Sequence, residues 1–170
     1  LGAVTGRVLR TEGHLNGHIS FVFGDALFCG DTLFTGGCGY LFDGPPERMH
    51  ESLQRLAALP GDTRVCCAHE YTQDNLRFAW FVEPENTALA NRIRAVWEKR
   101  AAGGCVVPST IAEERETNPF LRTDSTHIVR RLGEHLPEAS VNRPSDVFAA
   151  TRKLKDMKLH RQMDEATLPL

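Results

Sequence analysis

The 170-residue sequence lacks several features that would each indicate a particular class of protein. No apolar run approaches the roughly 20 residues needed to cross a bilayer, so we expect no membrane partner. No basic run stands out against a net charge of −2, so nucleic acid is not an expected partner either. Residues 1–10 contain no signal-peptide hydrophobic region and no initiator methionine, which suggests a start inside a longer reading frame.

Paired cysteines are also lacking. The cysteines are odd in number and form no Cys-x-x-Cys pair; they are Cys29, Cys38, Cys66, Cys67 and Cys105. A disulfide framework is therefore not expected, and a reducing compartment fits better. We expect most of these thiols to be buried as small apolar groups. This usage favours the cytoplasm, with the mitochondrion as the alternative location.

Residues 1–74 predict strands, tight loops and one helix in the order β-β-α-β. "HISFVF" and "ALFCG" are apolar, β-prone segments separated by Gly24-Asp25, which suits a type II′ hairpin turn. "PPERMHESLQRLAALPG" predicts a helix with an apolar stripe formed by Met49, Leu53 and Leu56. "TRVCCAHE" predicts a further buried strand that ends at a loop.

Residues 75–170 are predicted to be mainly helical. One helix in "DNLRFAWFVEP" ends before its proline, and a longer one in "NTALANRIRAVWEKRAAGG" ends at Gly-Gly. "STIAEERETNP" opens with Thr110 and Glu113 in capping-box spacing, and "PSDVFAATRKLKDMKL" offers Ser145 as an N-cap. The expected fold is an α/β layer followed by a small helical region.

Three residues at strand ends or in glycine-flanked loops could hold a metal ion: His14, Asp31 and His69. Zinc and iron sites favour imidazole and carboxylate donors, and a hydrolytic site leaves one position open for water. Each residue alone has an ordinary alternative. His14 could be a surface or capping residue, Asp31 a turn cap, and His69 a hydrogen-bonded core residue. Their separations are too long for a ligand motif, so these residues alone leave the choice open.

Longer segments carry more information. "GHLNGHISF", "ALFCGDTLFTGGCG" and "CCAHEYTQDNLRFAWFVEPEN", in this order, resemble glyoxalase II, the hydroxyacylglutathione hydrolases of the metallo-β-lactamase superfamily. "VPSTIAEERETNPFLR" and "RKLKD" resemble that family's helical C-terminal domain. The resemblance covers about residues 7–156 and weakens across 124–145. It implies that residues 1–74 are the second half of an αββα sandwich and that residues 75–170 are the helical domain.

The resemblance also implies a metal site. His14 and His69 match ligands of two separate metal ions, and Asp31 matches the carboxylate that bridges them. The expected metal is zinc, with iron or manganese as alternatives, and no catalytic residue separate from the metal site is implied. His18 is then expected to support the site by hydrogen bonding, the alternative being plain strand packing.

A substrate site is implied as well. Tyr71 matches a tyrosine that contacts glutathione, and Arg152 and Lys155 match a basic pair that holds a glutathione carboxylate. Their i, i+3 spacing places both on one helix face, where the ordinary alternative is a solvated basic surface. Tyr40 stands where the family usually has arginine or lysine, and Phe42 stands where some members have tyrosine.

One defining part of the family is missing from the chain. The HxHxDH ligand cluster lies upstream of the region covered, and the other histidines, His50, His127, His135 and His160, are isolated. Three ligands cannot fill two coordination shells, so we expect weak or no metal binding by this chain alone. The missing half would also leave a sheet edge and an apolar face exposed, to be covered by that half or by another chain.

The activity implied is hydrolysis of S-acylglutathione thioesters by a metal-activated hydroxide, as in methylglyoxal detoxification. S-lactoylglutathione would give lactate and glutathione. Two alternatives remain open. The chain could be a non-catalytic fragment or pseudo-enzyme interaction module, or a glutathione persulfide dioxygenase of the same superfamily. The helical tail ending in "RKLKD" argues against the dioxygenase.

Overall fold

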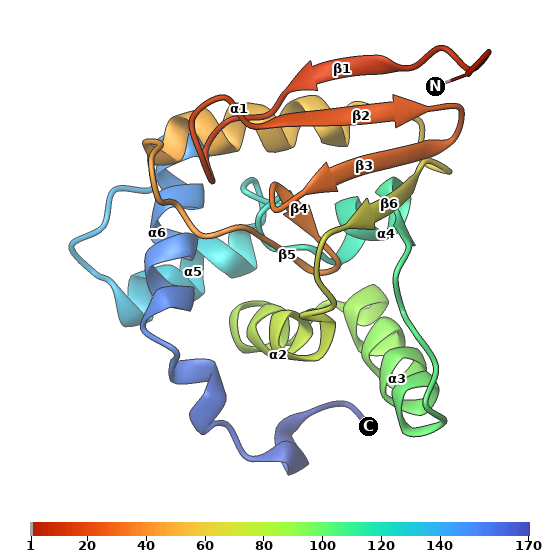
Figure 1. Cartoon of the computed structure of the whole chain (residues 1–170). Coiled ribbons are helices and arrows are strands. Elements are labelled where there is room, and N and C mark those ends of the chain that lie inside the picture. Colours follow the sequence, from red (N-terminus) through yellow and green to blue (C-terminus); the bar gives the residue numbers. More distant parts are fainter. Residues whose placement is uncertain (1) are drawn as a thin grey trace.

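The computed structural model describes residues 2–170, and within them the main sheet has five strands in the order β1-β2-β3-β6-β7 (Figure 1). Strands β3 and β6 run parallel, and the other neighbouring pairs are antiparallel. Strands β4 and β5 form a separate short hairpin. The bounds are β1 Arg7–Arg10, β2 Ile19–Phe23, β3 Ala26–Gly30, β4 Leu33–Phe34, β5 Gly37–Cys38, β6 Arg64–Cys67 and β7 Ser109–Thr110.

The described residues contain six α-helices and two short 3₁₀ turns. The helices are α1 Pro46–Ala57, α2 Thr72–Val82, α3 Thr87–Ala101, α4 Ile111–Thr117, α5 Thr126–His135 and α6 Pro144–Asp156. The turns η1 Leu159–Gln162 and η2 Glu165–Thr167 follow them. None of the helices within residues 2–170 has the length and apolar character of a membrane span.

Local sequence patterns account for most of these elements. Gly24 has φ +58° in the two-residue turn between β2 and β3, as the predicted hairpin requires. The predicted stripe of Met49, Leu53 and Leu56 is completely buried on α1. The Thr110 hydroxyl accepts the Glu113 N–H while the Glu113 carboxylate accepts the Thr110 N–H, so the predicted capping box is confirmed.

Two predictions about helix ends and cysteines are wrong. Helix α6 is capped by Arg143 and not by Ser145, because Pro144 occupies the first helical position, where its fixed φ is favourable. Only Cys29 and Cys38 are buried; Cys66 and Cys67 are partly buried, and Cys105 is exposed in the loop after α3. All five cysteines are free thiols. Helix α5 was not predicted, although Ser125 caps it.

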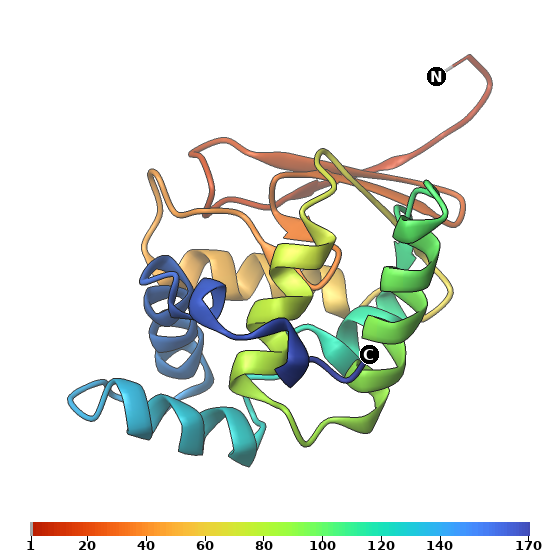
Figure 2. The same cartoon turned by 90° about the horizontal axis from the view of Figure 1, so that it is seen from below.

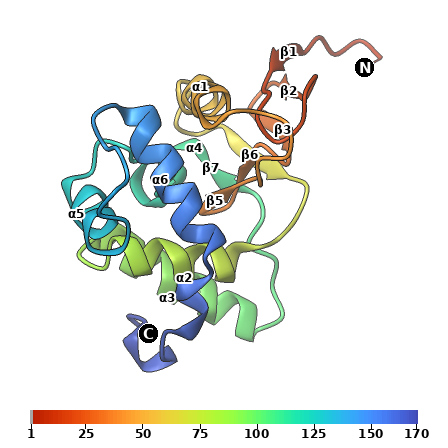
Figure 3. The ribbon, with the colours of Figure 1, turned by 90° about the vertical axis from the view of Figure 1, so that its left-hand side faces the viewer.

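The helices lie on one face of the sheet, and the opposite face is uncovered (Figures 1 and 3). Alternate residues of β1, β2 and β3 point to that open face: Val8, Ile19, Phe21 and Phe28 are 38% to 60% exposed. The predicted exposed apolar face is therefore confirmed.

The covered face of the sheet and the helices share one hydrophobic core. Leu27 and Val65 of the sheet belong to the same buried cluster as Phe120 and Phe148 of the helical region. A smaller second cluster lies between α2 and α3. The division after residue 74 stays a prediction, and the core on both sides of it is continuous.

Candidate functional site

The parallel pairing of β3 and β6 brings two of the predicted metal ligands together. Asp31 directly follows β3 and His69 lies just after β6, and neighbouring parallel strands end at the same sheet edge. His14 reaches the same place from the loop between β1 and β2. The His14 Nε2 lies 3.4 Å from Asp31 Oδ2, and the His69 Nε2 lies 3.4 Å from Asp31 Oδ1.

The hydrogen bonding of His14 fixes the orientation of its ring. Its Nδ1 lies 2.7 Å from the Tyr40 carbonyl, so Nδ1 carries the proton and donates it. The Nε2 of the same ring faces Asp31 Oδ2. The Asp31 Oδ1 is buried and has no hydrogen-bond partner within residues 2–170. These donor atoms therefore fit a bound metal ion.

The three side chains do not form one closed metal site. Within the described residues, no group of three or more His, Cys, Asp or Glu side chains could hold a metal ion. Each oxygen of Asp31 faces a different imidazole, so no single position lies close to both histidines and the carboxylate. The arrangement is a pair of half-sites joined by Asp31.

The ordinary alternatives for His69 and Asp31 are wrong. The side chain of His69 is half exposed and stacks on the Tyr71 ring at 5.1 Å, so it is not a core histidine. Asp31 forms no hydrogen bond that would cap a turn within the described chain. Both side chains therefore lie together at the sheet edge, 3.4 Å apart.

His18 lies beside this site and does not contact Asp31. Its Nδ1 is 3.1 Å from Thr11 Oγ1 and 3.0 Å from Thr32 Oγ1, and its ring stands perpendicular to the His14 ring at 6.3 Å. Burial, followed by the nearby His14, lowers the pKa of His18. Gly30 has φ +51°, and a Cβ there would approach His18 Nε2 to 2.9 Å, so a glycine is required.

A close backbone contact joins the β4–β5 hairpin to Asp31. A Cβ on Gly39 would lie 1.9 Å from the Asp31 carbonyl oxygen and 3.1 Å from His14 Nδ1. The Gly39 N–H donates to the Thr32 carbonyl at 3.3 Å. The segment leaving the hairpin therefore packs directly against the candidate ligands.

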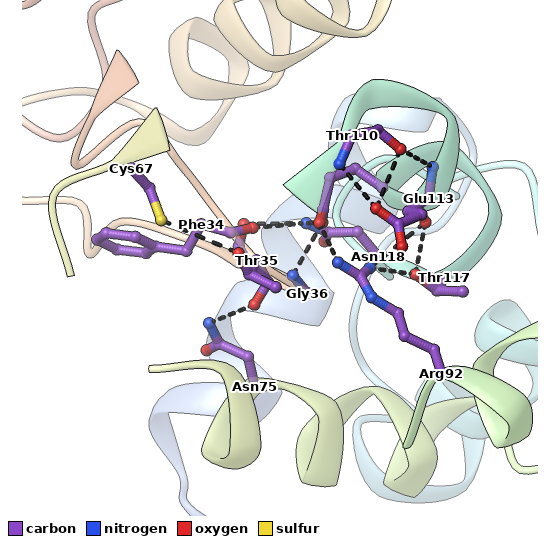
Figure 4. A network of polar contacts seen from close by, with 12 residues as sticks. Phe34, Thr35, Gly36, Cys67, Asn75, Arg92, Thr110, Glu113, Thr117 and Asn118 are labelled. Carbon is purple, nitrogen blue, oxygen red and sulfur yellow. Dashed lines mark hydrogen bonds and ion pairs between the residues drawn. The ribbon is translucent and has the colours of Figure 1, made fainter. Parts of the chain in front are cut away.

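A buried polar network connects this hairpin to α3 and α4 (Figure 4). The carboxylate of Glu114, which is completely buried, accepts from the Gly36 N–H at 2.8 Å, from Arg92 at 2.5 Å and from Asn118 at 2.9 Å. Asn118 also donates to two backbone carbonyls of the hairpin. No motif in the sequence indicated this network, because its members come from α3, α4 and the hairpin.

A pocket of about 250 Å³ opens beside these candidate ligands and is lined by most of the predicted substrate residues. Tyr40, Tyr71, Arg152 and Lys155 all line it. Arg152 and Lys155 are only 7% and 8% exposed, so the alternative of a solvated basic surface is wrong.

Hydrogen bonds to neighbouring elements hold the two cations of α6, Arg152 and Lys155, in place. Arg152 donates to the Cys38 carbonyl at 3.3 Å, and Lys155 donates to Asn75, whose amide donates in turn to the Thr35 carbonyl. Burial, followed by the charge of Arg152, lowers the pKa of Lys155 to about 8. The pocket thus presents buried positive charge next to the sheet edge that carries Asp31.

Residues 70–158, more than half of the chain, match the family model described as "Hydroxyacylglutathione hydrolase C-terminus". The chain belongs to the hydroxyacylglutathione hydrolase family. Residues 4–69 match the model of the metallo-β-lactamase superfamily, which confirms the predicted fold class.

Relatives from several bacteria are named hydroxyacylglutathione hydrolase. The proteins from Pseudomonas fluorescens and Halorhodospira halophila are 52% and 51% identical over 150 residues, which is 88% of this chain and 58% of each relative. The protein from Methylococcus capsulatus is 51% identical over 92% of this chain and 60% of its own length. The chain therefore spans about three-fifths of the length of these curated relatives.

Solved structures support the fold. ETHE1 from Myxococcus xanthus matches 92% of this chain and 55% of its own with a TM-score of 0.51 at 24% identity. A metallo-β-lactamase from Staphylococcus aureus matches 90% of this chain and 39% of its own with a TM-score of 0.50 at 20% identity.

Some residues of this candidate site differ from the sequence predictions. Phe42 is 65% exposed and does not line the pocket; its ring contacts His14 at 5.1 Å and Tyr40 at 4.9 Å. His160 is buried, with its Nε2 3.5 Å from Asp74. The pocket lining that was not predicted consists of Phe34, Cys38, Asp74, Asn75 and Arg161.

Proposed function

We propose that this chain supplies part of the active site of a glyoxalase II-type hydrolase. That enzyme hydrolyses S-acylglutathione thioesters such as S-lactoylglutathione, giving a hydroxy acid and glutathione, and so serves methylglyoxal detoxification. The observation that carries the proposal is the position of Asp31 between His14 and His69, with a buried cationic pocket beside it.

In this proposal His14, Asp31 and His69 hold metal ions, zinc in preference to iron or manganese. Metal bound there would lower the pKa of water and polarise the thioester carbonyl. The Tyr40 carbonyl keeps the His14 proton on Nδ1 and so leaves Nε2 free for the metal. His18 supports the loop that carries His14. Because Asp31 shares its oxygens between two half-sites, this chain alone binds metal weakly.

The pocket would hold the glutathione part of the substrate. Arg152 and Lys155 would pair with a carboxylate of the anionic tripeptide, and their burial makes that pairing stronger than it would be in water. Tyr71, which is half exposed and stacked on His69, would contact the same ligand near the metal. Tyr40 adds an uncharged aromatic wall, and Phe42 would contact the acyl end beside His14.

The remaining ligands would come from a further segment that contains HxHxDH, as part of the other half of the sandwich. That half, or another chain, would cover the open face of the sheet. Residues 1–74 and 75–170 would then be the partial metallo-β-lactamase region and the helical domain of the complete protein.

The test is turnover of S-lactoylglutathione with added Zn²⁺. A chimera that joins the N-terminal part of the Pseudomonas fluorescens relative to this chain should hydrolyse the thioester. The same chimera carrying Asp31→Asn should not. A well-folded chimera that binds zinc and shows no turnover would contradict the proposal.

A second candidate is a non-catalytic interaction module. Tyr40 favours it, because an uncharged ring stands in the pocket where the family usually has arginine or lysine. Metal analysis of the purified chain separates the two functions: near-stoichiometric, tightly bound metal would argue against the module.

A further inference from the structure

The C-terminal segment, residues 157–170, turns back after α6 and crosses α2 (Figure 2). Two contacts fasten it there. The indole N–H of Trp80 donates to the Thr167 carbonyl at 2.8 Å, and Arg77 pairs with Glu165 at 2.6 Å. The segment is therefore a packed part of the molecule, and η1 lies against both α2 and α6.

The turn η1 places one charged side chain at the pocket. Arg161 donates through Nε to Asp74 Oδ1 at 2.9 Å and through Nη2 to Asp74 Oδ2 at 3.3 Å. His160 packs beneath them, edge-on to the Phe78 ring at 5.3 Å and close to the same carboxylate. Contact with His160, and then the bonds from Arg161, hold the pKa of Asp74 well below its usual range. Asp74 is thus a charged anchor that orients the guanidinium.

Arg161 retains binding capacity in this position. Within residues 2–170 its Nη1 makes no hydrogen bond, and its side chain is 55% exposed. Three cations, Arg152, Lys155 and Arg161, line the pocket together with one carboxylate, Asp74, and Arg152 also pairs with Asp156 at 2.6 Å. Three cationic side chains around one pocket, with free N–H donors remaining on Arg161, suit a ligand with more than one carboxylate.

We infer that Arg161 is a specificity-determining residue that binds a second carboxylate of the ligand, while Arg152 and Lys155 bind the first. The inference rests on the proposed function, since the ligand class is a γ-linked peptide with two carboxylates. The family model ends at residue 158, so this contact comes from a segment outside the family match. The C-terminal segment then acts as one wall of the binding site.

The inference is tested by calorimetric titration of the full 170-residue chain with glutathione. Arg161→Gln removes the cation and uncovers Asp74, so affinity should fall by about 10-fold, as for a charge-assisted hydrogen bond. Arg77→Gln is the matched control, because it breaks another fastening contact of the same segment without touching the pocket. Its affinity should stay within about twofold of the wild type, because neither Arg77 nor Glu165 lines the pocket.

Glutathione diethyl ester separates carboxylate binding from a merely structural role. The ester lacks both carboxylates, so the wild type and Arg161→Gln should bind it within about twofold of each other. An equal loss of affinity for ester and free peptide would overturn the inference, because Arg161 would then act only by placing the segment.

Arg152→Gln distinguishes failure of the inference from failure of the proposed function. If Arg152→Gln weakens binding and Arg161→Gln does not, the pocket stands and the role of Arg161 is overturned. If neither substitution changes binding, or the wild type binds no glutathione up to about 10 mM, both the inference and the proposed function fail.

Discussion

Asp31 is the side chain on which the candidate site depends at the residue scale, because each of its carboxylate oxygens faces a different imidazole. Asp31→Asn removes the charge and one acceptor oxygen, so the zinc affinity of the chain should fall by more than about 10-fold. Removing a side chain that only hydrogen-bonds to a metal ligand can already cost that much. Calorimetric titration with Zn²⁺ measures it. Asp62→Asn, at an exposed loop position, should leave the affinity unchanged. Equal affinity of Asp31→Asn and wild type would contradict the prediction.

Lys155 predicts a pH dependence of stability at the same scale. Its pKa is about 8 in the folded chain and near 10.5 when exposed, so the unfolded chain binds more protons between these values. The free energy of unfolding should therefore rise with pH from about 8 to 10.5, by up to about 3 kcal/mol.

Other groups also titrate in this range, so the measurement is a comparison. Urea unfolding of the wild type and of Lys155→Met, at pH 7 and pH 10.5, isolates the lysine. The wild type should gain stability relative to Lys155→Met as the pH rises. A difference that stays constant with pH would show that Lys155 titrates normally.

At the element scale, the β4–β5 hairpin is held by the completely buried carboxylate of Glu114, which accepts a hydrogen bond from the Gly36 N–H. Glu114→Gln would leave the buried guanidinium of Arg92 without its counter-charge. We expect a loss of about 3–5 kcal/mol in the free energy of unfolding, measured by urea denaturation. Glu116→Gln, on the exposed side of the same helix, should change it by less than about 0.5 kcal/mol. A loss as small in Glu114→Gln would mean that the network does not hold the hairpin.

The segment after the hairpin makes a second prediction at this scale. In Gly39→Ala the new methyl group would meet the Asp31 carbonyl at 1.9 Å, so the backbone must shift beside the candidate ligands. Zinc affinity should fall together with stability, by about 1–3 kcal/mol for the latter. Gly61→Ala, whose methyl would meet only Ala112 at 3.4 Å, is the control. Unchanged zinc binding in a destabilised Gly39→Ala would separate the hairpin from the site.

At the scale of the whole molecule, the open face of the sheet is the dominant feature. Val8, Ile19, Phe21 and Phe28 form an exposed apolar surface over three adjacent strands, and such a surface favours association. The 170-residue chain should therefore self-associate with rising concentration and bind a hydrophobic dye.

Sedimentation velocity and dye fluorescence check this expectation. Phe21→Thr combined with Phe28→Thr should reduce both signals while keeping β propensity in the strands. Phe42→Thr removes an exposed ring outside the strands and should leave both unchanged. A wild-type chain that stays monomeric and binds no dye would show that the open face of the sheet does not promote association.

Local patterns in the sequence predicted most elements of the chain. The alternation in β2, the stripe on α1 and the capping box of α4 all involve residues a few positions apart, so local chemistry decides them. Helix α5 and the short strands β4, β5 and β7 were not predicted, because they depend on packing and pairing with distant segments. The start of α6 was misplaced by two residues because Pro144 outweighs Ser145 as a signal.

The sequence by itself determined most of the elements and the family segments, since these depend on neighbouring residues, and the family resemblance named the candidate ligands. Only the tertiary structure decided that His14 and His69 face opposite oxygens of Asp31. It alone decided that the basic pair of α6 is buried, and that Arg161 reaches the same pocket. The physical reason is that these contacts join strand ends, a hairpin and a returning C-terminal segment, which no local periodicity relates to one another.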